Sequence, residues 1–286
     1  MAPVTETVLT APDYDLGATL SSGQAFRWRE RDGAWEGVLG AQWVRLRQVE
    51  GAITATTAPA VERWDWLTDF LQLHVNLRQI LATFPDDEPM RSAVAACRGL
   101  RLLRQEPWEC LASFILSSTK QIVQIQQIVA LLCARYGQAI TAPDDRGQVH
   151  AFPRPERLAA LSAAQLRECK MGFRAPYLQG TARMLADGEV DLNAIAARSL
   201  PEARAELLRL PGVGPKIADC VLLFAFGFPE AFPVDVWIRK ALQQFYFPRR
   251  RVTQPRLERF KESHFGPHAG YAQQYLFHYA RTLKAW

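Results

Sequence analysis

The sequence lacks the features that mark membrane and secreted proteins. No apolar run in its 286 residues approaches the roughly 20 residues of a membrane-spanning helix. The first ten residues have neither a basic start nor an apolar centre, so we expect no signal peptide there. The five cysteines are odd in number and form no Cys-x-x-Cys pair, which is typical of reduced thiols in a cytosolic compartment. These features predict a soluble, intracellular protein without a membrane partner.

The composition leaves room for a large core and for a polyanionic partner. Apolar residues make up 49% of the chain, which is enough for a sizeable core. The 34 lysines and arginines exceed the 29 acidic residues, and the net charge is +5. This surplus is compatible with binding to nucleic acid. A soluble protein without such a partner can have the same surplus.

The residue pattern predicts an α+β protein in two parts. Residues 1 to about 60 are rich in aromatic and β-branched residues, which favours an antiparallel β-meander. From Trp64 onward, apolar residues recur at three- and four-residue spacing, which predicts helices. We expect an N-terminal antiparallel β-sheet lobe over 1–104 and a mainly α-helical domain over 105–286. The turn signals of the first part are Asp32-Gly33, Gly40 and Glu50-Gly51.

The second part is predicted to contain several helices separated by polar loops. One long helical stretch is expected over 107–137, followed by a Pro- and Asp-rich loop over 141–148. A later helix begins with Ser199 as its N-cap and Pro201 in its first turn.

A short glycine hairpin, "LPGVGPK", joins two of the predicted helices. Gly212, Val213 and Gly214 form the tight turn, and Pro215 takes the first position of the next helix. Glycine permits positive φ and a close approach to a ligand, and the N–H groups of a helix N-terminus attract phosphate. The element is therefore suited to hold a DNA phosphate without reading sequence. An ordinary helical hairpin would show the same pattern.

Lys216 and Asp235 follow this hairpin and are the candidate reactive pair. Lys216 lies in the first turn of an apolar helix, where the helix dipole and burial both disfavour an ammonium group. A neutral amine is a nucleophile and can form a Schiff base, although a lysine here could instead pair with phosphate. Asp235 opens another helix, for which its simplest role is the N-cap. Its carboxylate could also offset positive charge on a reacting sugar.

These motifs together resemble the helix-hairpin-helix DNA glycosylase superfamily and, more narrowly, its 8-oxoguanine DNA glycosylase family. The hairpin followed by "PVD" carries the first resemblance. The second rests on four further segments in the family's order: "SGQAFRW", "RLLRQEPWECLASFILSS", "MGFRAPYL" and "FGPHAGYAQQYLF". The resemblance covers most of the chain. It implies a glycosylase and lyase that flips 8-oxoguanine out of DNA, excises it through a Schiff base on Lys216 with help from Asp235, and nicks the strand by β-elimination.

The resemblance also assigns a pocket for the flipped base. It implies that the carbonyl of Gly23 accepts the hydrogen at N7 of 8-oxoguanine, which guanine lacks. Cys220 and Phe277 would sandwich the base, and Gln273 would read its Watson–Crick edge. Considered singly, these residues are equally compatible with a turn glycine, a small buried side chain and a core aromatic.

Other positions are implied to contact DNA. Arg174 would contact the opposite cytosine and Phe173 would wedge into the base stack, whereas each alone could be an ordinary surface residue. Thr119 and Lys120 occupy positions where the family has paired asparagines, and Gln124 replaces an arginine. Because those residues help to read the orphan cytosine, we expect looser selectivity for the opposite base.

Further departures concern the metal content and the neighbour of the reactive pair. Trp237 stands where the family has a histidine. No cysteine follows Cys220, which excludes the iron–sulfur cluster of other branches, and no histidine spacing is typical of zinc. We expect no cofactor, no metal, and a monomer that acts on double-stranded DNA containing an oxidised purine. It would associate with the nucleoid in the cytoplasm of a bacterium, or lie in the nucleus of a eukaryote. The alternatives are a glycosylase for another damaged base and a non-catalytic DNA-binding protein.

Overall fold

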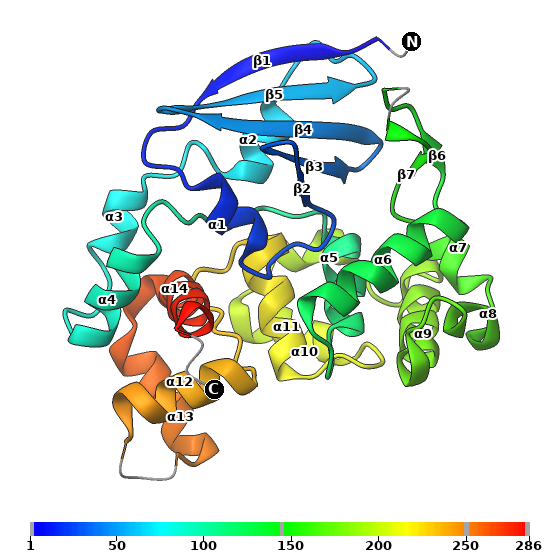
Figure 1. Ribbon diagram of the computed structural model, residues 1–286. Coiled ribbons are helices and arrows are strands. Elements are labelled where there is room, and N and C mark those ends of the chain that lie inside the picture. Colours follow the sequence, from blue (N-terminus) through cyan, green and yellow to red (C-terminus); the bar gives the residue numbers. More distant parts are fainter. Residues whose placement is uncertain (1–2, 144–145, 249–251, 284–286) are drawn as a thin grey trace.

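The computed structural model describes residues 3–143, 146–248 and 252–283. A five-stranded antiparallel sheet lies on one side of a larger helical body, which confirms the expected α+β architecture (Figure 1). The strand order in the sheet is β1-β5-β4-β3-β2, so the last four strands form the expected meander. The strands are β1 (Thr5–Thr10), β2 (Arg29–Arg31), β3 (Ala34–Leu39), β4 (Gln42–Val49) and β5 (Ala52–Ala58).

The N-terminal part also contains a helix that the strand pattern did not indicate. Helix α1 (Leu16–Ser21) begins after Asp15, whose side chain accepts a hydrogen bond from the N–H of Ala18 at 2.8 Å. An aspartate at an N-cap satisfies a free N–H group and stabilises even a short helix. The expectation of strands throughout this region was therefore wrong for these six residues.

The remaining elements form the helical body and one small hairpin. The body begins with α2 (Asp65–Leu71), and Ser199 caps α10 as expected by its bonds with Glu202. The loop expected over 141–148 joins β6 to β7, and its residues 144–145 lie outside the described residues. The other elements are α3 (Leu77–Leu81), α4 (Glu88–Ala96), α5 (Pro107–Leu116), α6 (Ile122–Tyr136), β6 (Ala139–Ile140), β7 (Val149–His150), α7 (Pro155–Ala159), α8 (Ala163–Arg167), α9 (Ala175–Ala186), α10 (Leu200–Leu208), α11 (Pro215–Val221), α12 (Val236–Tyr246), α13 (Gln254–His264) and α14 (Ala269–Thr282).

The long helix expected over 107–137 is in fact two helices, α5 and α6. They are separated by a loop in which Thr119 has a φ of 56°, a left-handed conformation that no helix interior contains. Gln121 and Gln124 then form a capping box that starts α6. The apolar pattern continues across this break, which is why periodicity alone did not reveal it.

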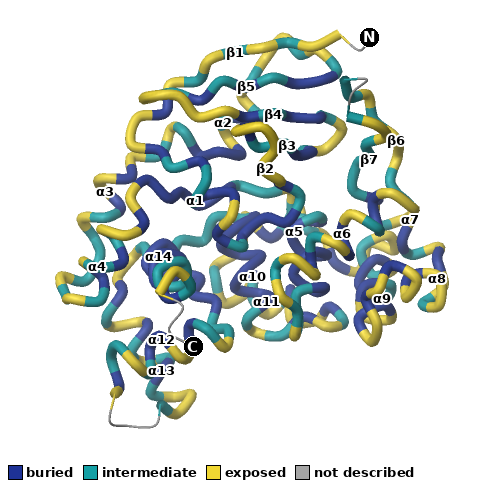
Figure 2. Tube along the Cα trace, in the orientation of Figure 1, coloured by how far each residue is buried: buried dark blue, intermediate teal, exposed yellow. Residues whose placement is uncertain are grey.

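The hydrophobic core consists of two clusters (Figure 2). The smaller one lies beneath the sheet and includes Trp28, Ile53 and Phe70. The larger one fills the helical body, yet it also takes Phe26 from the N-terminal part. Residue 105, the expected boundary, lies in an extended segment before α5, and the division there remains a prediction. Among the described residues, no helix is long and apolar enough to cross a membrane.

Candidate active site

The glycine hairpin has the form expected from the sequence. Helix α11 begins at Pro215, and Gly214 is its N-cap. Gly212 has a φ of 78°, and a Cβ atom there would lie 2.7 Å from the Cβ of Tyr177. A side chain at position 212 is therefore disfavoured both by the backbone and by the neighbour. Gly214, with a φ of −98°, does not need this freedom, and Val213 is buried between the two glycines.

Lys216 lies in the first turn of α11 and points toward the end of α5. Its Nζ donates a hydrogen bond to Ser117 Oγ at 3.2 Å and lies 5.0 Å from the centroid of the Phe114 ring. Within the described part of the chain, no carboxylate forms an ion pair with it. The half-buried amine is thus held by a hydroxyl group and an aromatic face.

Asp235 is the N-cap of α12, as the sequence predicted. Its Oδ1 accepts a hydrogen bond from the N–H of Ile238 at 2.7 Å. Burial raises the pKa of this carboxyl above its ordinary value, while the Ile238 hydrogen bond and the positive charge of Lys216 act in the opposite direction. The lysine and the carboxylate therefore face the same site without a direct ion pair.

A small cavity of about 50 Å³ brings the predicted catalytic and base-pocket residues together. Gln273 is 4% exposed, and its Oε1 has no hydrogen-bond partner among the described residues. Burial raises the pKa of the Cys220 thiol to about 12, so this side chain behaves as a small apolar wall. The cavity is lined by Gly23, Phe114, Lys216, Cys220, Phe224, Pro233, Asp235, Gln273, Gln274 and Phe277.

Gly23 reaches this cavity because the N-terminal part is fastened to α14. Gln274 Nε2 donates a hydrogen bond to the carbonyl of Ser22 at 3.1 Å. Gly23 itself has a φ of 83°, and a Cβ atom there would lie 2.8 Å from Cδ1 of Ile122. The backbone at this position therefore approaches the site more closely than a residue with a side chain would allow.

A larger cavity of about 830 Å³ adjoins the small one and shares Gly23, Phe114, Lys216, Asp235 and Phe277 with it. The loop between α5 and α6 forms another wall and contributes Thr119 and Lys120, the positions where the resembling family has asparagines. The further lining residues are Phe26, Ser117, Ser118, Gln121, Ile122, Val123, Ile125, Val234, Val236, Trp237, Arg239 and Arg281.

Arg174 is buried, so the interpretation of this residue as an ordinary surface charge was wrong. The residue is 3% exposed and donates hydrogen bonds to the carbonyl of Ser118 and, at 2.6 Å, to Thr119 Oγ1. Its guanidinium lies 4.2 Å from the centroid of the Phe173 ring, which is itself 58% exposed. The exposed phenyl ring of Phe173 therefore packs against a buried arginine whose own position is held by hydrogen bonds.

Gln124, at the position where the resembling family has an arginine, is exposed and forms part of the cap of α6.

Two residues of the site were not identified from the sequence. Ser117 binds Lys216, and Arg281 lines the larger cavity. Arg281 follows Gln273 and Phe277 at intervals of four residues on α14, so the three side chains lie on one face of that helix. This spacing was a usable signal, whereas no local pattern connects Ser117 with a lysine 99 residues away.

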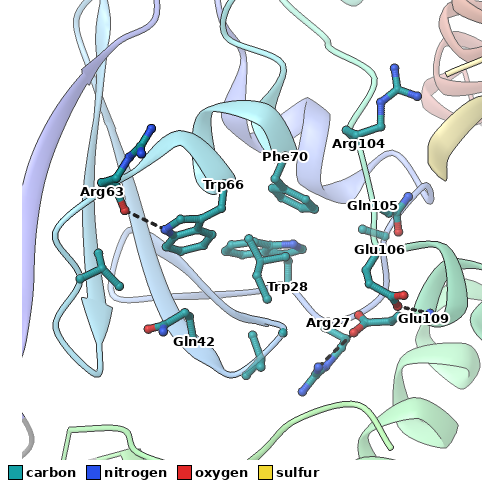
Figure 3. A pocket seen from close by; sticks show the side chains of 15 residues that line it. Arg27, Trp28, Gln42, Arg63, Trp66, Phe70, Arg104, Gln105, Glu106 and Glu109 are labelled. Carbon is teal, nitrogen blue, oxygen red and sulfur yellow. Dashed lines mark hydrogen bonds and ion pairs between the residues drawn. The ribbon is translucent and has the colours of Figure 1, made fainter. Parts of the chain in front are cut away.

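A separate cavity of about 460 Å³ lies between the sheet and α5 (Figure 3). Trp28, Trp66 and Phe70 form its aromatic walls, and Arg27 pairs with Glu109 at 3.2 Å on one side. It contains neither the lysine nor the aspartate of the candidate pair. Because it lacks this pair, we do not take it as the reaction site. Among the described residues, no group of three His, Cys, Asp or Glu side chains could hold a metal ion.

Comparison with known proteins shows the family of the chain. The chain belongs to the HhH-GPD superfamily of base excision DNA repair proteins, whose family model matches residues 112–265. Within it, the model of the 8-oxoguanine DNA glycosylase N-terminal domain matches residues 7–111, which confirms the narrower resemblance.

Individual relatives extend over nearly the whole chain. A probable N-glycosylase/DNA lyase from Methanothermobacter thermautotrophicus is 32% identical over 94% of both chains. The structure of MBOgg1 in complex with a low-affinity DNA ligand has a TM-score of 0.92 and 32% identity, covering 98% of this chain and 96% of that one. The Clostridium acetobutylicum 8-oxoguanine glycosylase/lyase, bound to double-stranded DNA with cytosine opposite 8-oxoguanine, has a TM-score of 0.91 and 28% identity over 98% of both chains.

Proposed function

We infer that the protein is an 8-oxoguanine DNA N-glycosylase with an accompanying DNA lyase activity. The observation that carries this inference is a single cavity in which Lys216, Asp235 and the candidate base-reading residues converge. Relatives that are named or described as glycosylase/lyases match the chain along nearly its full length. Because all parts of the site come from one chain, we propose that it acts as a monomer. Its location in the cell would follow its DNA, in the nucleoid or the nucleus.

Lys216 is proposed to be the nucleophile. Its Nζ lone pair forms a bond to C1′ of the deoxyribose, the bond from C1′ to the base breaks, and the electron pair leaves with the base. Loss of a proton from nitrogen and opening of the sugar ring give the Schiff base. Removal of a proton from C2′ then expels the 3′ phosphate and nicks the strand. The hydrogen bond to Ser117 aims the amine into the cavity before DNA binds.

Asp235 is proposed to stabilise the sugar while positive charge develops on it. A carboxylate with restricted access to water interacts more strongly with such a charge than it would in bulk solvent. The N-cap bond to Ile238 fixes its direction, so little reorganisation is needed during the reaction.

The small cavity is proposed to receive the extruded base after a change in side-chain position. Its volume of about 50 Å³ holds no more than one or two water molecules. Phe277 forms the wall between the two cavities, and its movement would open room for a purine. The free Oε1 of Gln273 could then accept hydrogen bonds from the Watson–Crick edge of 8-oxoguanine, and the Gly23 carbonyl could accept its N7 hydrogen.

The outer surfaces are proposed to hold the rest of the duplex. Gly212, Val213 and Gly214 would grip a phosphate, and Phe173 would enter the space left by the base. Arg174 would offer its Nη2 to the opposite cytosine only after releasing Ser118 and Thr119, because this nitrogen donates to both of them in the structure.

A substrate panel tests this function. Duplexes carry 8-oxoguanine, 3-methyladenine or undamaged guanine at one position, and strand breaks are measured with and without hot alkali. We expect release of 8-oxoguanine with breaks that do not need alkali. Preferential release of 3-methyladenine, or breaks that appear only after alkali, would contradict the substrate or the lyase activity, respectively.

A further inference from the structure

Arg281 is a half-buried cation beside the reactive pair, and one of its nitrogens is buried without a hydrogen-bond partner among the described residues. It lies in the last turn of α14, and its Nη1 is buried and donates to no partner among the described residues. Burial lowers the pKa of its guanidinium, and the negative charge of Asp235 opposes this effect. An arginine nevertheless stays charged in proteins. A buried N–H donor normally has a hydrogen-bond partner, so the Nη1 donor is available for a ligand.

The guanidinium lines the larger cavity and lies near Phe277, which lines both cavities. Its Cζ lies 5.4 Å from the centroid of the Phe277 ring. Its Nη1 lies 3.6 Å from the place that a Cβ atom on Gly23 would occupy. Lys216 and Asp235 line the same larger cavity. Arg281 is therefore placed beside the sugar of any nucleotide whose base enters the small cavity and whose C1′ reaches the lysine.

The chemistry of this donor selects an anion. The anionic groups of an extruded nucleotide are the two phosphates on either side of its sugar, and a guanidinium binds phosphate through parallel charge-assisted hydrogen bonds. Trp237 lines the same cavity at the position where the resembling family has a histidine. An indole offers one uncharged donor. Arg281 on α14 would supply a positive charge to this cavity that Trp237 on α12 does not supply.

We propose that Arg281 binds a phosphate next to the extruded nucleotide and thereby positions C1′ for attack by Lys216. This inference rests on the proposed function. The phosphate provides the missing partner for Nη1, and the contact with Phe277 holds the plane of the guanidinium. Arg281 is a positioning residue, since it takes no part in bond making or breaking.

The test combines variants with neutralised phosphates. Wild type, Arg281→Leu and Arg281→Lys are compared on 8-oxoguanine duplexes that carry one uncharged methylphosphonate on the 5′ or the 3′ side of the lesion. Arg78→Leu is the matched control, because it removes an arginine that forms an exposed pair with Asp13 and lines neither cavity of the site. The measurements are the dissociation constant at several salt concentrations, the single-turnover excision rate and the melting temperature.

Arg281→Leu should bind unmodified lesion DNA about 10- to 100-fold more weakly, as expected for loss of hydrogen bonds to a charged group. The slope of the logarithm of its DNA-binding constant against the logarithm of salt concentration should become shallower by about 0.9, the contribution of one phosphate. Arg281→Lys should keep most of this salt dependence, because it keeps the positive charge. One of the two methylphosphonates should weaken DNA binding by wild type to a similar extent. The same methylphosphonate should not weaken DNA binding by Arg281→Leu any further. Arg78→Leu should match wild type throughout.

Equal sensitivity of wild type and Arg281→Leu to both methylphosphonates would overturn the proposal. If Arg281→Leu does not fold, the same comparison with Arg281→Lys decides, since an ammonium lacks the parallel hydrogen bonds and should reduce the sensitivity at the contacted phosphate. Failure of wild type to cleave unmodified 8-oxoguanine DNA would instead contradict the proposed function, which keeps the two outcomes apart.

Discussion

Replacing Asp235 by asparagine separates its structural role from its proposed chemical role. The carboxylate accepts the N–H of Ile238 at 2.7 Å, and an asparagine oxygen can accept the same bond. The two residues cap helices about equally well. The substitution therefore removes the charge and leaves the cap, and any loss of activity can be assigned to the charge.

The effect on stability follows from the raised pKa of this carboxyl, which is caused first by burial. A raised carboxyl pKa means that the folded state binds the proton more tightly than the unfolded chain does. Stability contributed by this group is therefore lost as pH rises from the ordinary carboxyl pKa through the raised value. At pH 7, Asp235→Asn should melt at the same temperature as wild type or higher, and any advantage should disappear below the ordinary carboxyl pKa.

Although Asp235→Asn should leave the stability of the fold unchanged or raise it, the same substitution should slow catalysis. Loss of a preorganised group that stabilises developing charge typically slows a reaction by about 10²- to 10³-fold. Single-turnover excision on 8-oxoguanine DNA should slow by that factor, with little change in DNA binding. Wild-type activity should decline as pH falls through the raised pKa of Asp235. The activity of the variant should not decline over this pH range, because asparagine does not titrate there. A normal rate for Asp235→Asn, or a destabilisation of more than about 1 kcal/mol at pH 7, would refute the reasoning.

Three further predictions concern glycine positions and the opposite base. Gly23→Ala should reduce 8-oxoguanine excision more than cleavage at an abasic site, because a Cβ there would lie 2.8 Å from Ile122 Cδ1 and would displace the carbonyl that is proposed to bind the base; equal losses would indicate a general defect. Because lysine offers only donors, whereas asparagine offers a donor and an acceptor, the preference for cytosine should be about 10- to 100-fold weaker than in asparagine-bearing relatives. Thr119→Asn combined with Lys120→Asn should restore it in single-turnover rates with each opposite base, and an unchanged preference would contradict this account. Gly227→Ala should lower the free energy of unfolding by more than about 2 kcal/mol, because φ is 75° and the new Cβ would lie 1.8 Å from Arg104 Nη1. Denaturant titration measures this change, and an unchanged unfolding midpoint would show that the arginine moves away without cost.

Local chemistry explains which parts of the fold could be predicted from the sequence. Pro215 and Asp235 mark helix starts through their own backbone and side-chain preferences, and both lie where the pattern placed them. The break at Thr119 was missed because a left-handed residue interrupts hydrogen bonding without changing the apolar spacing around it. Helix α1 was missed for a related reason, since an aspartate cap outweighed a region of strand-forming composition.

The site itself depends on contacts between distant segments. The family resemblance placed Gly23 beside Phe277, but no periodicity in either segment predicts that Gln274 fastens Ser22 to α14. The burial of Arg174 likewise depends on a loop 55 residues earlier in the chain. Such pairings are set by the packing of the whole helical body, and residue types alone do not specify them.

Borohydride trapping is the most direct test of Lys216 as the nucleophile. Wild type and Lys216→Gln are incubated with an 8-oxoguanine duplex in the presence of borohydride, and the covalent protein–DNA complex is measured after denaturation. Ser117→Ala serves as a matched control, because it removes the hydrogen bond to Nζ while keeping the amine. The account predicts a trapped complex for wild type and Ser117→Ala and none for Lys216→Gln. A complex of equal yield with Lys216→Gln would mean that another amine attacks the sugar.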